Sequence, residues 1–82
     1  MTEPDWNAKV QLRAGETLRH EGSKAEGFMQ ETDVNTYSII DAAGSVTGSV
    51  KVTDHTAVKG FKRTVRVVQK DATGKIIVDT TL

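Results

Sequence analysis

The second half of the chain alternates apolar and polar residues in a regular way. Residues 61–70 place Val65 and Val67 on one face and mainly polar side chains on the other, and a second β-branched run follows at 75–81. A period of two over such a length is typical of a β-strand with one buried face. The connector Asp71-Ala72-Thr73-Gly74 is rich in residues that favour turns, so the sequence predicts a β-hairpin.

Two registers of this hairpin compete. A three-residue loop with a bulge at Gly74 sets Asp71 opposite Lys75, whereas a four-residue loop sets Lys70 opposite Lys75. We favour the four-residue loop because it separates apolar from polar side chains better, and a slip by one residue would turn every side chain to the wrong face. This register pairs Val67 with Val78, Val65 with Thr80, Gln69 with Ile76, Arg66 with Asp79 and Val68 with Ile77.

The middle of the chain repeats this arrangement. Two runs, 35–41 and 45–53, flank the turn Asp41-Ala42-Ala43-Gly44, which matches the later turn at three of its four positions. We therefore predict a second, similar hairpin. Gly48 weakens its second strand unless an aromatic side chain covers it, and we expect Tyr37 to lie opposite and supply that cover.

Residues 6–13 also alternate, with Trp6, Ala8, Val10 and Leu12 on one side. This pattern predicts a further strand, with the indole of Trp6 as an anchor in the core.

Residues 16–33 give conflicting signals. Residues 17–20 suit a short strand, whereas Ser23 and Glu26 have the spacing of a helix capping box and indicate a short helix over 24–31. Gly27 opposes that helix, so a loop or a short strand around residues 28–30 is an equal alternative.

Together these patterns predict a mainly β protein. We expect one antiparallel β domain over residues 1–82, built as a small meander of five to six strands that forms a curled sheet, a small barrel or a half-sandwich. One short helix near residues 24–31 remains an option. The five strands that the pattern predicts most clearly are 6–13, 35–41, 45–53, 61–70 and 75–81.

The composition of the chain indicates the cellular compartment in which this domain is expected. The chain has no cysteine, so no disulfide or thiol chemistry is available, and a reducing compartment fits. The acidic start lacks the apolar run of a signal peptide, and no apolar run approaches the roughly 18 residues of a membrane span. We expect a cytoplasmic protein without membrane contact.

The charge is unevenly distributed although its net value is zero. Residues 1–41 hold four Lys/Arg against eight Asp/Glu, and residues 42–82 hold seven against three, so the halves carry −4 and +4. One interpretation is that the halves attract each other within the fold, and the other is that the basic half faces a polyanion or an acidic partner.

Catalytic signatures are not evident in this sequence. The only imidazoles are His20 and His55, and a zinc site needs three or four ligands at fixed distances. Gly44 and Gly48 sit in a predicted hairpin rather than before a helix, so they do not form a phosphate loop. We therefore predict no enzyme, no metal and no cofactor.

Binding is the function that remains. We predict a protein-interaction module, with homodimerisation through the C-terminal hairpin as one form, because Val68 and Ile77 make an apolar spot on its polar face and a short meander leaves unpaired strand edges. The alternative is a nucleic-acid-binding β domain that uses the basic strand 59–70. The candidate interaction residues are Lys59, Lys62, Arg63, Arg66, Val68, Lys70 and Ile77.

Overall fold

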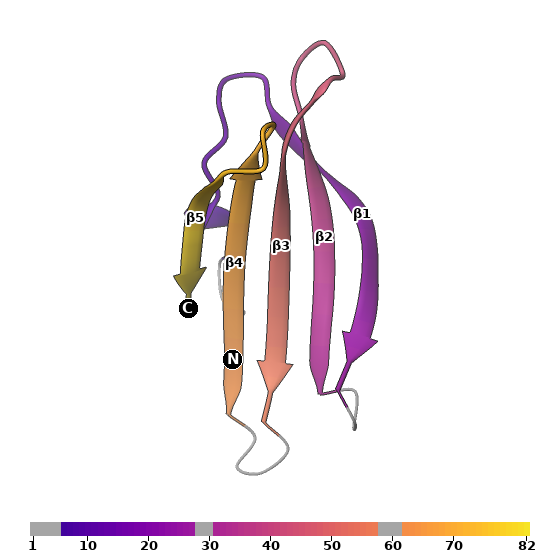
Figure 1. The fold of residues 1–82 in the computed structure, drawn as a ribbon, viewed down its shortest axis with the longest axis vertical. Helices are drawn as coiled ribbons and strands as arrows, with labels where there is room; N and C mark the ends of the chain where they lie inside the picture. Colours follow the sequence, from indigo (N-terminus) through magenta and orange to yellow (C-terminus); the bar gives the residue numbers. More distant parts are fainter. Residues whose placement is uncertain (1–5, 28–30, 58–61) are drawn as a thin grey trace.

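A computed structural model describes residues 6–27, 31–57 and 62–82 of the chain. One 3-10 helical turn precedes an antiparallel sheet in which the strands follow one another in the order β1-β2-β3-β4-β5 (Figure 1). The sheet is open, with β1 and β5 at its two edges, so the predicted antiparallel meander is confirmed. The elements are η1 (Trp6–Lys9), β1 (Thr17–Glu26), β2 (Thr32–Ile40), β3 (Val46–Thr56), β4 (Arg63–Asp71) and β5 (Ile76–Thr81).

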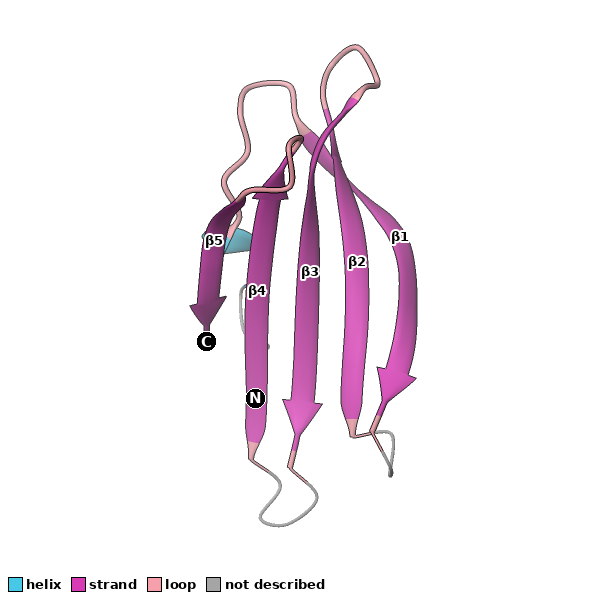
Figure 2. Cartoon of the chain, viewed as in Figure 1, coloured by secondary structure: helices cyan, strands magenta, loops and turns pink. Residues whose placement is uncertain are grey.

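The strand predicted over 6–13 is wrong. Residues 6–9 form η1, and the residues after it run as an irregular segment that arches from β4 to the start of β1 (Figures 1 and 2). Trp6 in η1 and Val10 just after it still pack against the core, and the N–H of Val10 bonds to the carbonyl of Asn7 at 3.1 Å. The alternation was therefore compatible with two backbone shapes, and packing against the sheet decided between them.

The helix considered for 24–31 is also wrong where the structure describes it. Residues 24–26 belong to β1, which extends the strand suggested at 17–20, and Gly27 follows it with a φ of +95°. This left-handed backbone conformation suits glycine and ends the strand. Residues 28–30 lie outside the described residues, so the alternative strand around them is not tested.

The core lies on one face of the sheet, here called the core face. Its cluster of buried side chains comprises Ile39, Val50, Val52, Val65 and Val67. The partly buried side chains that pack against it are Trp6, Val10, Leu18 and Tyr37. Trp6 is the predicted core anchor, and its ring lies 5.0 Å from that of Tyr37. The first segment of the chain thus covers the face that the sheet's valines would otherwise expose.

Gln69 ties this segment to the sheet. Its side chain is only 1% exposed. The Nε2 group donates to the carbonyl of Gln11 at 2.7 Å, and Oε1 accepts from the backbone N–H of Gln11 at 2.8 Å. A buried polar group must be paired to be tolerated, and here its partner is a backbone that has no strand ladder of its own.

Both hairpins use the same turn, as their sequences predict. The Asp41 carboxylate accepts bonds from the N–H groups of Ala43 and Ser45, each at 2.9 Å. The Asp71 carboxylate accepts the equivalent bonds from Thr73 and Lys75, at 2.9 and 3.0 Å. The closing glycines of the two turns, Gly44 and Gly74, have φ values of +85° and +89°.

The register favoured for the last hairpin is wrong. Val67 pairs with Thr80, Gln69 with Val78 and Val68 with Asp79, two residues away from the expected alignment. The turn matches the three-residue alternative, since the N–H of Asp71 bonds to the carbonyl of Lys75, and a bulge then adds one more residue to β5. Beyond the bulge, a slip of two residues leaves the side chains of Val78 to Thr81 on their expected faces, so the apolar pattern there could not detect it. Ile76 instead pairs with Lys70 and lies on the face opposite the expected one.

The pairing of the first hairpin is also shifted by two residues, so Tyr37 does not cover Gly48 as expected. Tyr37 pairs with Val50, and Gly48 lies opposite Ile39. A Cβ atom at Gly48 would stand 2.6 Å from the carbonyl oxygen of Lys70 and 3.2 Å from Cδ1 of Ile39. Glycine is therefore required at this position by the close approach of β4 and an isoleucine, rather than by an aromatic ring.

Candidate functional site

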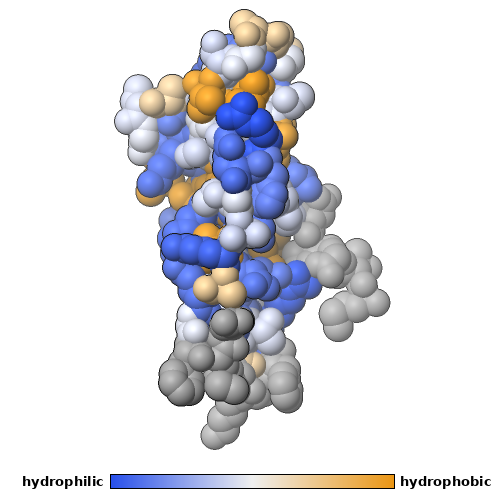
Figure 3. Space-filling view, turned by 90° about the vertical axis from the view of Figure 1, so that its right-hand side faces the viewer, coloured by the Kyte–Doolittle hydropathy of each residue, from blue (hydrophilic) through white to orange (hydrophobic). Residues whose placement is uncertain are grey.

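The outer edge of β1 is protected by charge. Arg19 pairs with Glu21 at 2.8 Å and Lys24 with Glu26 at 3.1 Å. Ser38 donates a hydrogen bond to Glu21, and this bond together with Arg19 lowers the pKa of that carboxyl. The edge as seen in Figure 3 is mainly hydrophilic along its middle. Charged side chains on an edge strand discourage pairing with another chain.

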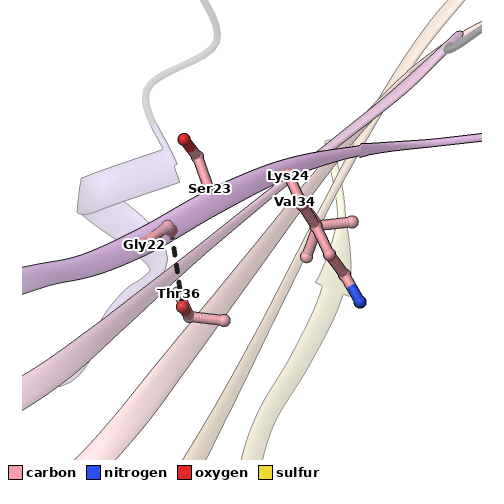
Figure 4. Close-up of a pocket in the computed structure, with 5 residues that line it drawn as sticks. All are labelled: Gly22, Ser23, Lys24, Val34 and Thr36. Carbon is pink, nitrogen blue, oxygen red and sulfur yellow. Dashed lines mark hydrogen bonds between the residues drawn. The ribbon is translucent and has the colours of Figure 1, made fainter.

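A bulge between His20 and Gly22 further distorts this edge. Thr36 donates to the carbonyl of Gly22 at 3.4 Å, and a shallow pocket opens beside this bond (Figure 4). Figure 4 shows Lys24 and Val34 pointing to the same side of the sheet, with Ser23 on the other. Bulges and charges are both devices that keep an edge from pairing, so β1 is a poor place for a partner strand.

The β5 edge has the opposite character. Ile76, Ile77 and Leu82 are 52%, 43% and 39% exposed. The carboxylate of Asp79 on this strand is engaged by Arg66 through two bonds of 2.8 and 2.9 Å. This pairing lowers the pKa of the Asp79 carboxyl. The edge therefore offers apolar side chains, and its one carboxylate is already neutralised.

The backbone of β5 presents hydrogen-bonding groups outward. The N–H of Leu82 bonds to the carbonyl of Val65 on β4. Backbone groups of successive strand residues alternate in direction. Residues 78 and 80 therefore face β4 as Leu82 does, and Asp79 and Thr81 direct their N–H and C=O groups away from the sheet.

A pocket of about 300 Å³ opens where β5 begins, and its apolar lining includes Leu12, Ile39 and Ile77. Leu12 and Ile77 are both more than two-fifths exposed. At its rim Glu16 accepts a hydrogen bond from Thr47 at 2.5 Å, which lowers the pKa of the Glu16 carboxyl. The pocket can take a small apolar side chain from a partner that approaches β5.

The structure separates the two residues of the predicted apolar spot. Val68 pairs with Asp79, and it lines a groove together with Ile76 on the face opposite the core. Ile77 instead lines the pocket beside Leu12 and Ile39. The bulge in β5 is the cause, because it places one unpaired residue between Ile76 and Val78. The expected Val68–Ile77 pairing is therefore wrong.

The basic cluster is divided as well. Arg63 pairs with Asp54, its Nε donating at 3.0 Å, and Arg66 pairs with Asp79. Lys62 is exposed immediately before β4, and Lys59 lies outside the described residues. Lys70 is exposed and makes no ion pair within the described residues.

The face opposite the core, here called the open face, collects cations from two strands. Its groove of about 390 Å³ is lined by Thr36, Tyr37, Ser49, Val50, Lys51, Thr53, Arg66, Val68, Lys70 and Ile76. Lys51 is not among the candidate residues that the sequence predicted. The sequence feature that could have identified it is the alternation of 45–53, which places Lys51 between Ser49 and Thr53 on the polar side of that strand.

The two histidines lie on opposite faces. The ring of His20 is 5.1 Å from that of Tyr37 on the core face, and Nδ1 of His55 is 2.6 Å from Oγ1 of Thr32 on the open face. Within the residues that the structure describes, no three His, Asp or Glu side chains gather where they could hold a metal ion. No helix in those ranges is long and apolar enough to cross a membrane.

Comparisons of the chain with protein-family models, curated proteins and solved structures found no match.

Proposed function

We propose that this protein is a non-enzymatic, cytoplasmic binding module that self-associates through the β5 edge. The observation that carries the proposal is the difference between the edges. β1 has a bulge near its middle and carries two ion pairs. β5 exposes Ile76, Ile77 and Leu82, and its own bulge lies near its start, before Val78. Strand addition at such an edge combines backbone hydrogen bonds with apolar contacts.

A second copy of the chain fits this edge without a charge clash. A two-fold axis at Thr80 pairs Asp79 of one copy with Thr81 of the other, the two residues whose backbone groups point outward. The same axis sets Val78 against Leu82, which extends the apolar core face across the junction. Self-complementarity of this kind is what a two-fold dimer requires.

The expected dimer is weak because the paired stretch is short. Four backbone hydrogen bonds, each of about 1 kcal/mol net, and one apolar contact on each side must offset the entropy of association. We expect a dissociation constant on the order of 100 μM, as for interfaces below the standard size.

Sedimentation velocity from micromolar to about 1 mM protein tests this proposal. Thr81→Pro removes an outward N–H donor at a position where an edge strand tolerates proline, and it should abolish the dimer, whereas Thr81→Val should keep it. Leu82→Lys should also give a monomer. Val46→Lys is the matched control, since Val46 is 55% exposed on the other hairpin.

A monomer throughout this concentration range would refute self-association. A dimer that both Thr81→Pro and Leu82→Lys leave unchanged would place the interface elsewhere than β5.

A further inference from the structure

We propose that the open face binds the phosphate backbone of a nucleic acid, with Lys51 and Lys70 as the principal contacts. This inference goes beyond the β5 interface and does not depend on it. It rests on the placement of cations, hydroxyl groups and one engaged arginine around a single groove.

The two lysines are neighbours on the open face. Lys51 on β3 pairs with Val68 on β4, and Ser49 pairs with Lys70. Lys51 and Lys70 are therefore diagonal partners, at a separation of about 7–8 Å for such positions in an antiparallel pair. Both are exposed, and the ion pairs of the described residues include neither. Flexible side chains at this spacing can direct both ammonium groups to one phosphate or to adjacent phosphates.

Hydroxyl groups complete the polar lining of the groove. Thr36, Ser49 and Thr53 line it together with the two lysines. Lysine and hydroxyl side chains are the usual partners of nucleic-acid phosphates. The lining thus offers charge and neutral hydrogen-bond donors over the same small surface.

Arg66 helps to select the ligand. It lies diagonal to Lys51, since its own partner on β3 is Thr53, but its guanidinium already holds Asp79 through two bonds. Arginine is the residue that best matches a carboxylate in a bidentate fork. Because the Arg66 guanidinium is already bonded to Asp79, lysines are the cations left to bind a ligand. A lysine ammonium binds phosphate as a point charge, so this face suits a phosphate backbone better than the carboxylates of an acidic peptide.

Base recognition is not part of this proposal. Within the described residues, Tyr37 is the only Trp, Tyr or Phe in the groove lining, and its ring packs on the core face against Trp6. Bases that stack need exposed aromatic platforms. We therefore expect backbone contacts, with little dependence on sequence.

Fluorescence anisotropy with labelled DNA of about 20 nucleotides, single-stranded and duplex, tests this site on the full chain at about 20 mM salt. We expect binding to both, with log K falling against log salt at a slope of about −1.8 for duplex if two phosphates are neutralised. Lys51→Gln and Lys70→Gln should each weaken binding about 3- to 10-fold and reduce the slope by about 0.9. Circular dichroism of each variant checks that the sheet is retained.

Lys75→Gln is the matched control, because Lys75 is an exposed lysine in the last turn and lies outside the groove. Equal weakening by Lys75→Gln would show that overall charge rather than this face attracts DNA, and it would overturn the proposal. No binding at low salt would also overturn it. A heparin fragment that displaces DNA more strongly at equal charge concentration would assign the face to sulfated polyanions instead, and the nucleic-acid inference would be wrong.

Discussion

Replacing Gln69 by leucine tests whether one buried amide holds the first segment onto the sheet. Gln69 exchanges two hydrogen bonds with the backbone of Gln11 from a position that is 1% exposed. Leucine keeps a similar apolar volume but offers neither donor nor acceptor. The change therefore removes polar pairing with little loss of packing.

The cost follows from the two bonds. Each contributes about 1 ± 0.5 kcal/mol net. Gln11 is exposed, so its freed N–H and C=O can return to water once the segment shifts. We expect a loss of about 2 kcal/mol in the free energy of unfolding. A domain of this length has roughly 4–12 kcal/mol in total, so the loss is a large share.

Urea unfolding measured by circular dichroism gives the size of this effect. With an m-value of about 1 kcal/mol/M for a small domain, the midpoint should fall by about 2 M. Emission of Trp6 reports the segment directly, since its ring packs against Tyr37, and it should change at lower urea than the sheet signal in the variant.

Gln11→Ala is the matched control, because only backbone atoms of Gln11 take part in these bonds. It should leave the midpoint nearly unchanged. If Gln69→Leu is as stable as the natural chain and its Trp6 emission is unaltered, apolar contacts alone hold the segment and the role assigned to the amide is wrong.

Three further predictions concern the sheet and its turns. Gly48→Ala should cost about 1–3 kcal/mol in thermal unfolding, because its Cβ would meet the Lys70 carbonyl at 2.6 Å, whereas Gly22→Ala, with no atom within 4 Å of the added Cβ, should be neutral or slightly stabilising. Asp71→Ala removes the carboxylate that orders the last turn and should lower stability by about 1 kcal/mol, which Asp71→Asn should partly restore. In the folded protein Ser38 lowers the pKa of the Glu21 carboxyl and Arg66 lowers that of the Asp79 carboxyl. A carboxyl with a lowered pKa stabilises the fold fully above its ordinary pKa and loses that contribution as the pH falls, so urea midpoints should fall as pH drops below about 4.5. Midpoints that stay constant down to about pH 3 would contradict this prediction.

The candidate surfaces were predictable only in part. The sequence singled out Arg66 and its contact with Asp79. The ion pair forms, but Arg66 lies opposite Thr81, so the expected pairing of the two residues across the strands is wrong. The sequence could not show that this ion pair leaves Lys70 as the unpaired cation of β4, nor that Lys51 joins it from β3. Which side chains become neighbours across strands depends on register, and register is not visible in the spacing along one strand.

The two similar turns show that turn residues predict a hairpin but not the register of its strands. Asp and Gly at matching positions predicted two similar hairpins, and both close with the same set of bonds. Each second strand then has a bulge just after the turn. Because the bulge and the turn together shift the pairing by two residues, the residues beyond each bulge keep their face and their apolar pattern is satisfied by both alignments. Val46 and Ile76, which lie between turn and bulge, are turned to the other face.

By itself, the sequence determined that this chain forms antiparallel hairpins and that the central valines of β3 and β4 line their shared face, because period-two alternation and turn residues act locally. The tertiary structure alone decided the shape of residues 6–13. In isolation their alternation suits a strand, but an open sheet with one apolar face needs a cover, and the buried amide of Gln69 supplies hydrogen bonds that a neighbouring strand would otherwise provide.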